Sequence, residues 1–209
     1  MSARTVPATV VLVPGLRSHA ADHWQTHLAE TLPDVVTVPP LGRQDPSLDE
    51  RVTQLHRAVT EVDGPVVLVA HSAGVLVAVH WAAGYGGTAV RGALLATPPT
   101  LADQLPAGYP SIRQLRSHGW LPIPRRPLPF PSTVAASTDD PLANPVRLRA
   151  LARAWGSRWH SLGAVGHLNP ASGYGDWPEA AALIRDLESS DVRPEPDAVP
   201  PHRLQRVPA

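Results

Sequence analysis

Three kinds of side chain that could together hydrolyse an acyl bond lie far apart in the sequence. Ser72 sits in the stretch Ala70–Gly74, Asp139 and Asp140 are neighbours, and His167 lies in a glycine-rich segment. Each follows a short apolar run that is typical of a buried strand. If these strands are parallel, their carboxyl ends meet at the edge of the sheet where such sheets bind ligands. We therefore expect the three to converge.

The chemistry of these residue types is complementary. A serine hydroxyl is a poor nucleophile at neutral pH, so it needs a base that takes its proton during attack. The imidazole of His167 suits this role because its pKa lies near neutrality. The imidazolium that then forms needs a carboxylate to fix its tautomer and stabilise its charge. The sequence predicts Ser72 as nucleophile, His167 as base and an aspartate as their partner.

Two adjacent aspartates compete for the carboxylate role. Asp140 directly precedes Pro141 and lies further from the preceding strand, so it is better placed to turn toward the loop of His167. Asp139 could instead hold the turn through hydrogen bonds to backbone N–H groups. We favour Asp140 as the partner of His167 and keep Asp139 as the alternative.

The surroundings of Ser72 predict a sharp turn between a strand and a helix. Val66–Val69 is an unbroken β-branched and apolar run, and Ala73–Ala83 is small and apolar at nearly every position. A serine at such a turn has a strained backbone and projects its hydroxyl above the sheet. The residues two positions away must be small because the strand and helix backbones nearly touch, and Ala70 and Gly74 meet that demand.

Backbone N–H groups near this turn could stabilise the negative charge that develops on the substrate oxygen. The residue after the nucleophile, Ala73, supplies one donor in this kind of turn, and the loop after the first strand supplies the other. That loop begins Pro14-Gly15-Leu16. We expect the N–H groups of Leu16 and Ala73 to form the oxyanion hole.

Strand-like and helix-like segments alternate along the chain. Strands are expected at residues 8–13, 35–38, 66–69, 90–96, 133–136 and 158–162, and helices at 22–32, 47–61, 73–83, 145–154 and 177–187, with Asp22 as N-cap of the first helix. This alternation predicts a parallel sheet with helices on both faces. The order Ser, Asp, His further favours the three-layer α/β-hydrolase fold in a minimal form, with a mostly parallel sheet of about six strands.

Two proline-rich segments interrupt the alternation. We expect residues 1–189 to form one domain and the proline-rich residues 190–209, which contain few apolar side chains, to be disordered. Residues 98–131 combine many prolines with apolar side chains, including Trp120. This segment either forms a short helical cap over the site or packs as an irregular surface loop.

Composition restricts the classes of function. The chain has 209 residues, 43% of them hydrophobic, a formal net charge of +0 and no cysteine. The charge balance gives no basic surface for nucleic acid or an anionic membrane, and thiolate chemistry is excluded. No apolar run approaches membrane-spanning length or the form of a signal peptide. We expect a cytoplasmic protein that acts on a small molecule, with no nucleic-acid or membrane partner and no cofactor.

Three histidines near the first helix raise the alternative of a metal site. His19, His23 and His27 have helical spacing, but the capping signal at Asp22 places His19 outside the helix. No acidic or cysteine ligand accompanies them at a suitable spacing. We therefore expect no metal, and we expect His71 to serve in packing, since the strained turn should point it away from the nucleophile.

Several separate motifs resemble those of the retinoblastoma-binding protein 9-like serine hydrolases. They are Val13–Leu16, His23–Gln25, Ala70–Gly74, Ser137–Pro141 and Gly166–Gly173, within a resemblance that spans about residues 8–188. It implies a small α/β hydrolase with Ser72, Asp140 and His167 as its triad and an esterase-type or aminopeptidase-type activity. The Leu-x-Cys-x-Glu motif that binds the retinoblastoma protein is absent because the chain has no cysteine.

We therefore expect a serine hydrolase that cleaves small esters or amides through an acyl-enzyme, with Trp24 and Trp120 shaping the substrate cleft. The alternative is a binding or scaffold protein on a hydrolase fold with little turnover, because a fold alone does not guarantee chemistry. Labelling of Ser72 by a fluorophosphonate probe separates the two.

Overall fold

A computed structural model describes residues 7–16, 20–41, 47–102 and 104–189. Its centre is a six-stranded, wholly parallel sheet with the order β2-β1-β3-β4-β5-β6. The strands are β1 (Thr9–Val13), β2 (Val35–Thr37), β3 (Val66–His71), β4 (Val90–Ala96), β5 (Ser132–Ser137) and β6 (Arg158–Gly163). The predicted fold is confirmed: this is the α/β-hydrolase arrangement of a parallel sheet between helices.

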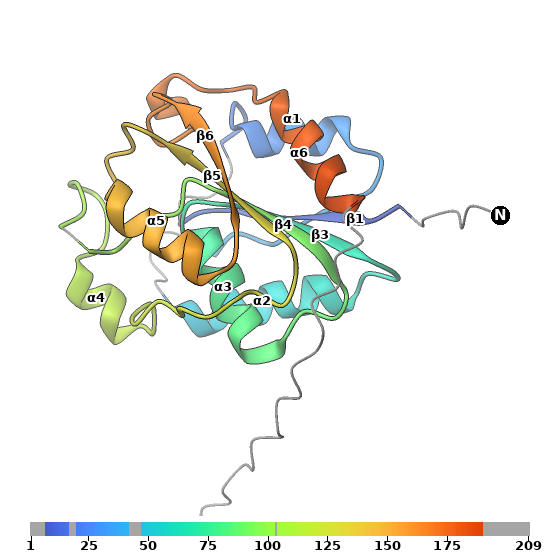
Figure 1. Ribbon diagram of the computed structural model, residues 1–209, viewed down its shortest axis with the longest axis horizontal. Coiled ribbons are helices and arrows are strands. Elements are labelled where there is room, and N and C mark those ends of the chain that lie inside the picture. The colour runs from blue at the N-terminus through green and yellow to red at the C-terminus, as the bar shows by residue number, and fades with distance from the viewer. Residues whose placement is uncertain (1–6, 17–19, 42–46, 103, 190–209) are drawn as a thin grey trace, which may run out of the picture.

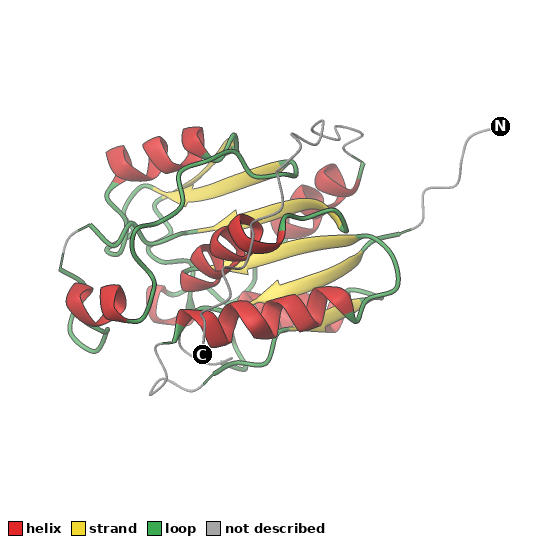
Figure 2. Cartoon of the chain, turned by 90° about the horizontal axis from the view of Figure 1, so that it is seen from below, coloured by secondary structure: helices red, strands yellow, loops and turns green. Residues whose placement is uncertain are grey.

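Helices cover both faces of the sheet. They are α1 (Trp24–Thr31), α2 (Leu48–Thr60), α3 (Ala73–Tyr85), α4 (Ile112–Ser117), α5 (Pro145–Ala154) and α6 (Glu179–Glu188), with a short 3-10 helix at Pro170–Ser172. The helices α1 and α6 lie on one side of the sheet and α2 and α3 on the other (Figure 1). Seen from below, helices run across the face of the sheet that turns toward the viewer (Figure 2).

Two apolar clusters, one on each face, hold the layers together. The larger contains buried side chains of α2, α3 and α5, and the smaller contains those of α1 and α6. The strands β1 and β3 are buried along their whole length because both faces are covered, which is why their sequences are continuous apolar runs. No helix among the described residues is long and apolar enough to cross a membrane.

The strand order reverses between β1 and β3. After β1 the chain forms β2, which lies on one side of β1 and is an edge strand of the sheet. It then forms β3 on the other side of β1, and β4, β5 and β6 continue the sheet to the opposite edge. The loops after β1 and β3 diverge at this point, and in open parallel sheets this leaves a crevice for ligands. Residues 14–16 and Ser72 lie in these two loops, so the topology places them at the same opening.

The described residues 98–102 and 104–131 contain one helix, α4, and otherwise irregular backbone. The helix has the reciprocal capping box of Ser111 and Gln114. Leu115 and Trp120 are buried and belong to the larger apolar cluster. Residue 103 and the predicted tail at 190–209 lie outside the described residues.

Candidate active site

Ser72 occupies the turn between β3 and α3 with a backbone that non-glycine residues seldom adopt. Its φ is 57° and its ψ is −127°. Such a conformation costs on the order of 1–3 kcal/mol and persists only where the surroundings enforce it. Here the Ser72 N–H donates to the Ala96 carbonyl oxygen at 2.9 Å, which ties the turn to the end of β4. The hydroxyl is therefore presented at the carboxyl edge of the sheet.

The small residues around Ser72 are required by backbone contact. A Cβ at Gly74 would lie 2.3 Å from the Val13 carbonyl oxygen and 2.6 Å from that of Pro14. A Cβ at Gly15 would lie 3.1 Å from the Cβ of Ser72. The loop after β1 thus lies in close contact with both Ser72 and the start of α3.

The three predicted reactive side chains meet in one hydrogen-bonded chain. His167 Nε2 lies 2.7 Å from Ser72 Oγ, and His167 Nδ1 lies 3.0 and 2.9 Å from Asp140 Oδ1 and Oδ2. Because a carboxylate only accepts, Nδ1 carries the proton, which leaves Nε2 as the acceptor of the Ser72 hydroxyl. Ser72, Asp140 and His167 are 8%, 8% and 4% exposed, so little water competes for these contacts.

The two neighbouring aspartates have separate partners. Asp140 turns inward to His167, and its Oδ1 also accepts the Leu142 N–H at 2.9 Å. Asp139 is exposed, and its Oδ1 accepts the Ser137 hydroxyl at 2.8 Å and the Gly166 N–H at 2.7 Å. These two donors lower the pKa of Asp139. Asp139 thus ties the loop of His167 to the end of β5, and Asp140 contacts the imidazole.

The backbone on both sides of His167 is held as well. The His167 N–H donates to Ser172 Oγ at 3.0 Å, and the Ser172 N–H donates to Asn169 Oδ1 at 3.0 Å. Leu168, the next residue, has a φ of 48°, which is strained for leucine. The loop therefore holds His167 in a defined position at the expense of local strain.

His71 has a closer relation to the site than its sequence suggests. Its side chain is buried, and its Nε2 lies 3.0 Å from the carbonyl oxygen of His167. The rings of His23 and Trp24 pack against it at centroid distances of 4.7 and 5.8 Å. Burial, and then the nearby His167, lower the pKa of His71 well below its usual value, so the ring is neutral. The sequence showed only its position beside Ser72.

The expected oxyanion donors lie near Ser72. Leu16 follows β1, and Ala73 is the first residue of α3, where helix geometry leaves the N–H without an intrahelical acceptor. Both residues line the same cavity as Ser72.

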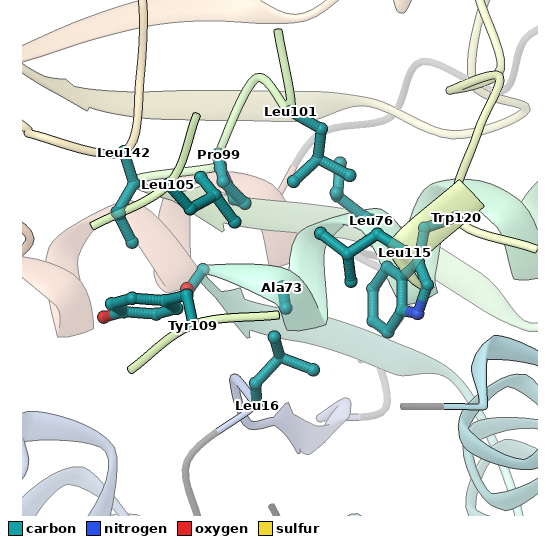
Figure 3. Close-up of a pocket in the computed structure, with 11 residues that line it drawn as sticks. Leu16, Ala73, Leu76, Pro99, Leu101, Leu105, Tyr109, Leu115, Trp120 and Leu142 are labelled. Atoms are coloured by element: carbon teal, nitrogen blue, oxygen red, sulfur yellow. The ribbon is translucent and has the colours of Figure 1, made fainter. Parts of the chain in front are cut away.

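A hollow of about 300 Å³ opens beside Ser72. Figure 3 shows its lining side chains around Ala73, with Leu115 and Trp120 on one side and Leu105, Tyr109 and Leu142 on the other. More than half of the lining residues come from the segment 98–131. The predicted cleft residue Trp120 is among them.

Trp24 does not line this hollow, contrary to expectation. It is 1% exposed and belongs to the smaller apolar cluster on the opposite face of the sheet. Its ring packs edge-on against those of His71 and Trp177, at centroid distances of 5.8 and 5.0 Å. The cause is that α1 packs on the far side of the sheet, so its first residue faces the core and not the cleft.

The expected N-cap of the first helix is displaced by one residue. His23, not Asp22, caps α1, and its Nδ1 accepts the Gln25 N–H at 3.2 Å. His27 hydrogen-bonds to Asp176 instead of turning toward His23. His19 lies outside the described residues, and among those described no group of three or more His, Asp or Glu could hold a metal ion.

Comparison with known proteins gives this geometry a context. The model of a family described as serine hydrolase matches residues 10–186. Among solved structures, a YdeN-like hydrolase of Pectobacterium atrosepticum is 28% identical, with 87% of this chain and 90% of that chain covered and a TM-score of 0.73. The ydeN gene product of Bacillus subtilis is 18% identical, with 88% and 100% covered and a TM-score of 0.63.

A more distant structure shares the fold. The N-formylmaleamic acid deformylase of Pseudomonas putida is 16% identical, with 86% of this chain and 92% of that chain covered and a TM-score of 0.63. A search of the curated proteins finds no match.

Proposed function

Because this chain belongs to the serine hydrolase family, we propose that it hydrolyses small esters or amides through an acyl-enzyme on Ser72, with His167 as base and Asp140 as orienting acid. The observation that supports this most directly is the buried chain of hydrogen bonds from Ser72 Oγ to His167 Nε2 and from Nδ1 to Asp140. In this arrangement the Ser72 hydroxyl can donate to His167 Nε2 while the opposite ring nitrogen faces the Asp140 carboxylate.

In the acylation step, Ser72 Oγ attacks the substrate carbonyl carbon while His167 Nε2 takes the hydroxyl proton. The Asp140 carboxylate, which already accepts from Nδ1, stabilises the positive charge on the ring. The tetrahedral intermediate collapses when the bond to the leaving group breaks and His167 returns the proton to that group. The acyl group remains as an ester on Ser72.

Deacylation repeats these steps with water. His167 Nε2 accepts a proton from a water molecule as its oxygen attacks the acyl carbon, and it then returns a proton to Ser72 Oγ as the carboxylic acid leaves. In both halves the carbonyl oxygen becomes negatively charged. The N–H groups of Leu16 and Ala73 stabilise this charge, and loss of one such donor commonly lowers kcat about 100- to 1,000-fold.

We further propose that the chain belongs to the retinoblastoma-binding protein 9-like branch and acts as a carboxylesterase-like enzyme, with aminoacyl amides as the second substrate class to examine. The motifs at residues 13–16, 70–74, 137–141 and 166–173 support this placement.

The test combines a covalent probe with a substrate screen. We expect a fluorophosphonate to label wild-type protein on Ser72 and to leave Ser72→Ala unlabelled. With p-nitrophenyl esters, Ser72→Ala and His167→Ala should lower kcat by about 10⁴-fold or more. A folded Ser72→Ala that retains activity would refute the proposed nucleophile, and wild-type protein without an adduct or turnover would support a binding protein on this fold.

A further inference from the structure

The hollow beside Ser72 is open at one end and closed at the other. At its open end Leu16, Leu105 and Tyr109 are half-buried. At its closed end Leu76, Leu115 and Trp120 are 0%, 1% and 1% exposed. We take the side with the half-buried residues as the mouth of the hollow and the buried side chains of Leu115 and Trp120 as its floor.

The walls are apolar. Among the described residues, the lining consists of Leu, Pro, Ala and Trp side chains apart from Ser72 and Tyr109. None of these described lining residues is charged. An ammonium group buried among them would lose its hydration without gaining a carboxylate partner, which is strongly unfavourable.

The hollow is also small. The empty space of about 300 Å³ includes solvent that is open to the surface, so the enclosed part of the hollow is smaller still. The closed floor sets a maximum length for any chain that enters from Ser72.

We propose that this hollow is the acyl site of the enzyme and that it selects short, uncharged, apolar acyl groups over long-chain and α-aminoacyl groups. The inference rests on the proposed function, because the acyl carbon must sit at Ser72. It makes aryl or alkyl esters of short carboxylic acids the preferred substrates and predicts that α-aminoacyl esters and amides are poor ones. The residues that set acyl length are Leu115 and Trp120.

A chain-length series tests the floor. For phenyl esters from acetate to dodecanoate, kcat/KM should rise about fourfold for each methylene that becomes buried and then fall once the chain reaches the floor. Leu115→Ala should move the maximum to a longer chain, and Trp120→Phe is a milder second variant. Leu105→Ala, at the mouth, is the matched control and should leave the maximum at the same length.

A matched pair of substrates tests the charge preference. The phenyl esters of 4-methylpentanoic acid and leucine differ only in the α-ammonium group, and the 2-hydroxy analogue separates polarity from charge. At pH 7, below the ordinary α-amino pKa of about 7.7–8.0, the leucine ester should have a kcat/KM at least about 100-fold lower after division by each ester's hydroxide-catalysed rate. The hydroxy ester should fall between them.

The outcomes separate the two proposals. If wild-type protein cleaves none of the esters, or if Ser72→Ala cleaves them as well, the proposed function fails. If wild-type cleavage depends on Ser72 but increases steadily to dodecanoate, or favours the leucine ester, only the acyl-site proposal is overturned. A maximum that stays in place in folded Leu115→Ala and Trp120→Phe would also overturn the assigned floor.

A separate observation concerns the carbonyl group of His167. It accepts from His71 Nε2 at 3.0 Å and from Thr97 Oγ1 at 3.5 Å, in a buried setting. The following residue, Leu168, has the strained φ of 48°. Because a carbonyl oxygen only accepts, His71 must carry its proton on Nε2.

We infer that His71 is a positioning residue, which holds the His167 peptide against relaxation of the strained loop so that the imidazole stays on Ser72 Oγ. Ser137, Asp139 and Ser172 accept from N–H groups of this loop. His71 acts on the carbonyl side of the same residue. Loss of its donor should therefore loosen His167 without touching substrate.

The test compares His71→Leu, which removes the donor, with His71→Gln, which can keep one at a similar distance. His71→Leu should lower kcat about 10- to 100-fold at nearly unchanged KM, since displacements near 1 Å have effects of that size. The rate of fluorophosphonate labelling should fall in parallel, and His71→Gln should recover much of both. Equal losses in the two variants, in proportion to their folded fractions, would show a packing role alone and overturn the inference.

Discussion

Gly74 offers the sharpest test of how the nucleophile turn is built. In Gly74→Ala the new methyl carbon would lie 2.3 Å from the Val13 carbonyl oxygen and 2.6 Å from the Pro14 carbonyl oxygen. Favourable C···O contacts lie near 3.3–3.6 Å, so the loop after β1 or the start of α3 must move by about 1 Å. Both partners are backbone atoms, so no side-chain rotation can relieve the contact.

The magnitude follows from this displacement. Overpacking of a filled interior costs about 1–3 kcal/mol, and a clash with rigid backbone belongs at the upper end, so the free energy of unfolding should fall by about 3 kcal/mol. The moved loop also carries the Leu16 N–H. If that group is an oxyanion donor, kcat should fall by about 100-fold or more.

The same helix supplies the control. Gly84 also lies in α3, and a Cβ there would have nothing within 4 Å. Gly84→Ala should raise the free energy of unfolding by about 0.5–1 kcal/mol, because alanine is the better helix former, and should leave kcat unchanged. Urea unfolding and p-nitrophenyl ester kinetics measure both variants. Equal stability of Gly74→Ala and Gly84→Ala would refute the close approach on which this reasoning depends.

Three further predictions follow from the contacts around His167. Asp140→Ala should lower kcat by about 10⁴-fold, whereas Asp139→Ala, which frees the Gly166 N–H and the Ser137 hydroxyl, should lower it about tenfold. Similar losses in steady-state assays would contradict the division of roles. Ser172→Ala removes the acceptor of the His167 N–H. It should lower the free energy of unfolding by about 1 kcal/mol, measured by urea titration, and should lower kcat several-fold. The pKa of His71 is lowered from 6.5 in the folded state. Below pH 6.5 the unfolded chain therefore binds a proton at His71 that the folded chain does not bind. The contribution of the neutral His71 ring to stability is complete above pH 6.5 and is progressively lost below it. The free energy of unfolding should therefore fall by up to about 1.4 kcal/mol per pH unit below pH 6.5, and His71→Gln should flatten this dependence; an unchanged slope would contradict the buried neutral ring.

The sheet and its helices could be predicted because burial on both faces leaves a direct mark on the sequence. The strand predicted at 90–96 has those bounds in the structure, and the helix predicted at 47–61 begins and ends within one residue of α2. The incorrect predictions occur where two neighbouring residues can both fill the same structural role. Asp22 is a good N-cap residue, yet the helix begins after His23, whose ring nitrogen performs the same task.

Contacts between distant segments could not be predicted in this way. The hydrogen bond between His71 and the His167 carbonyl joins residues 96 positions apart and depends on the exact path of one loop. The sequence predicts Trp24 at the cleft, whereas the face of the sheet on which α1 packs decides its position. The sequence predicts different roles for Asp139 and Asp140 from their distances to the preceding strand, and the structure gives each carboxylate a different partner.

The positions of Ser72, Asp140 and His167 depend mainly on hydrogen bonds made by backbone groups. Ser72 is presented by a strained turn tied to Ala96, Asp140 by the Leu142 N–H, and His167 by partners on both its N–H and its carbonyl. Donors and acceptors fixed in this way need no reorganisation during the reaction, which is the main source of electrostatic catalysis. Substitutions that leave Ser72, Asp140 and His167 intact should therefore still change kcat when they release one of these backbone groups.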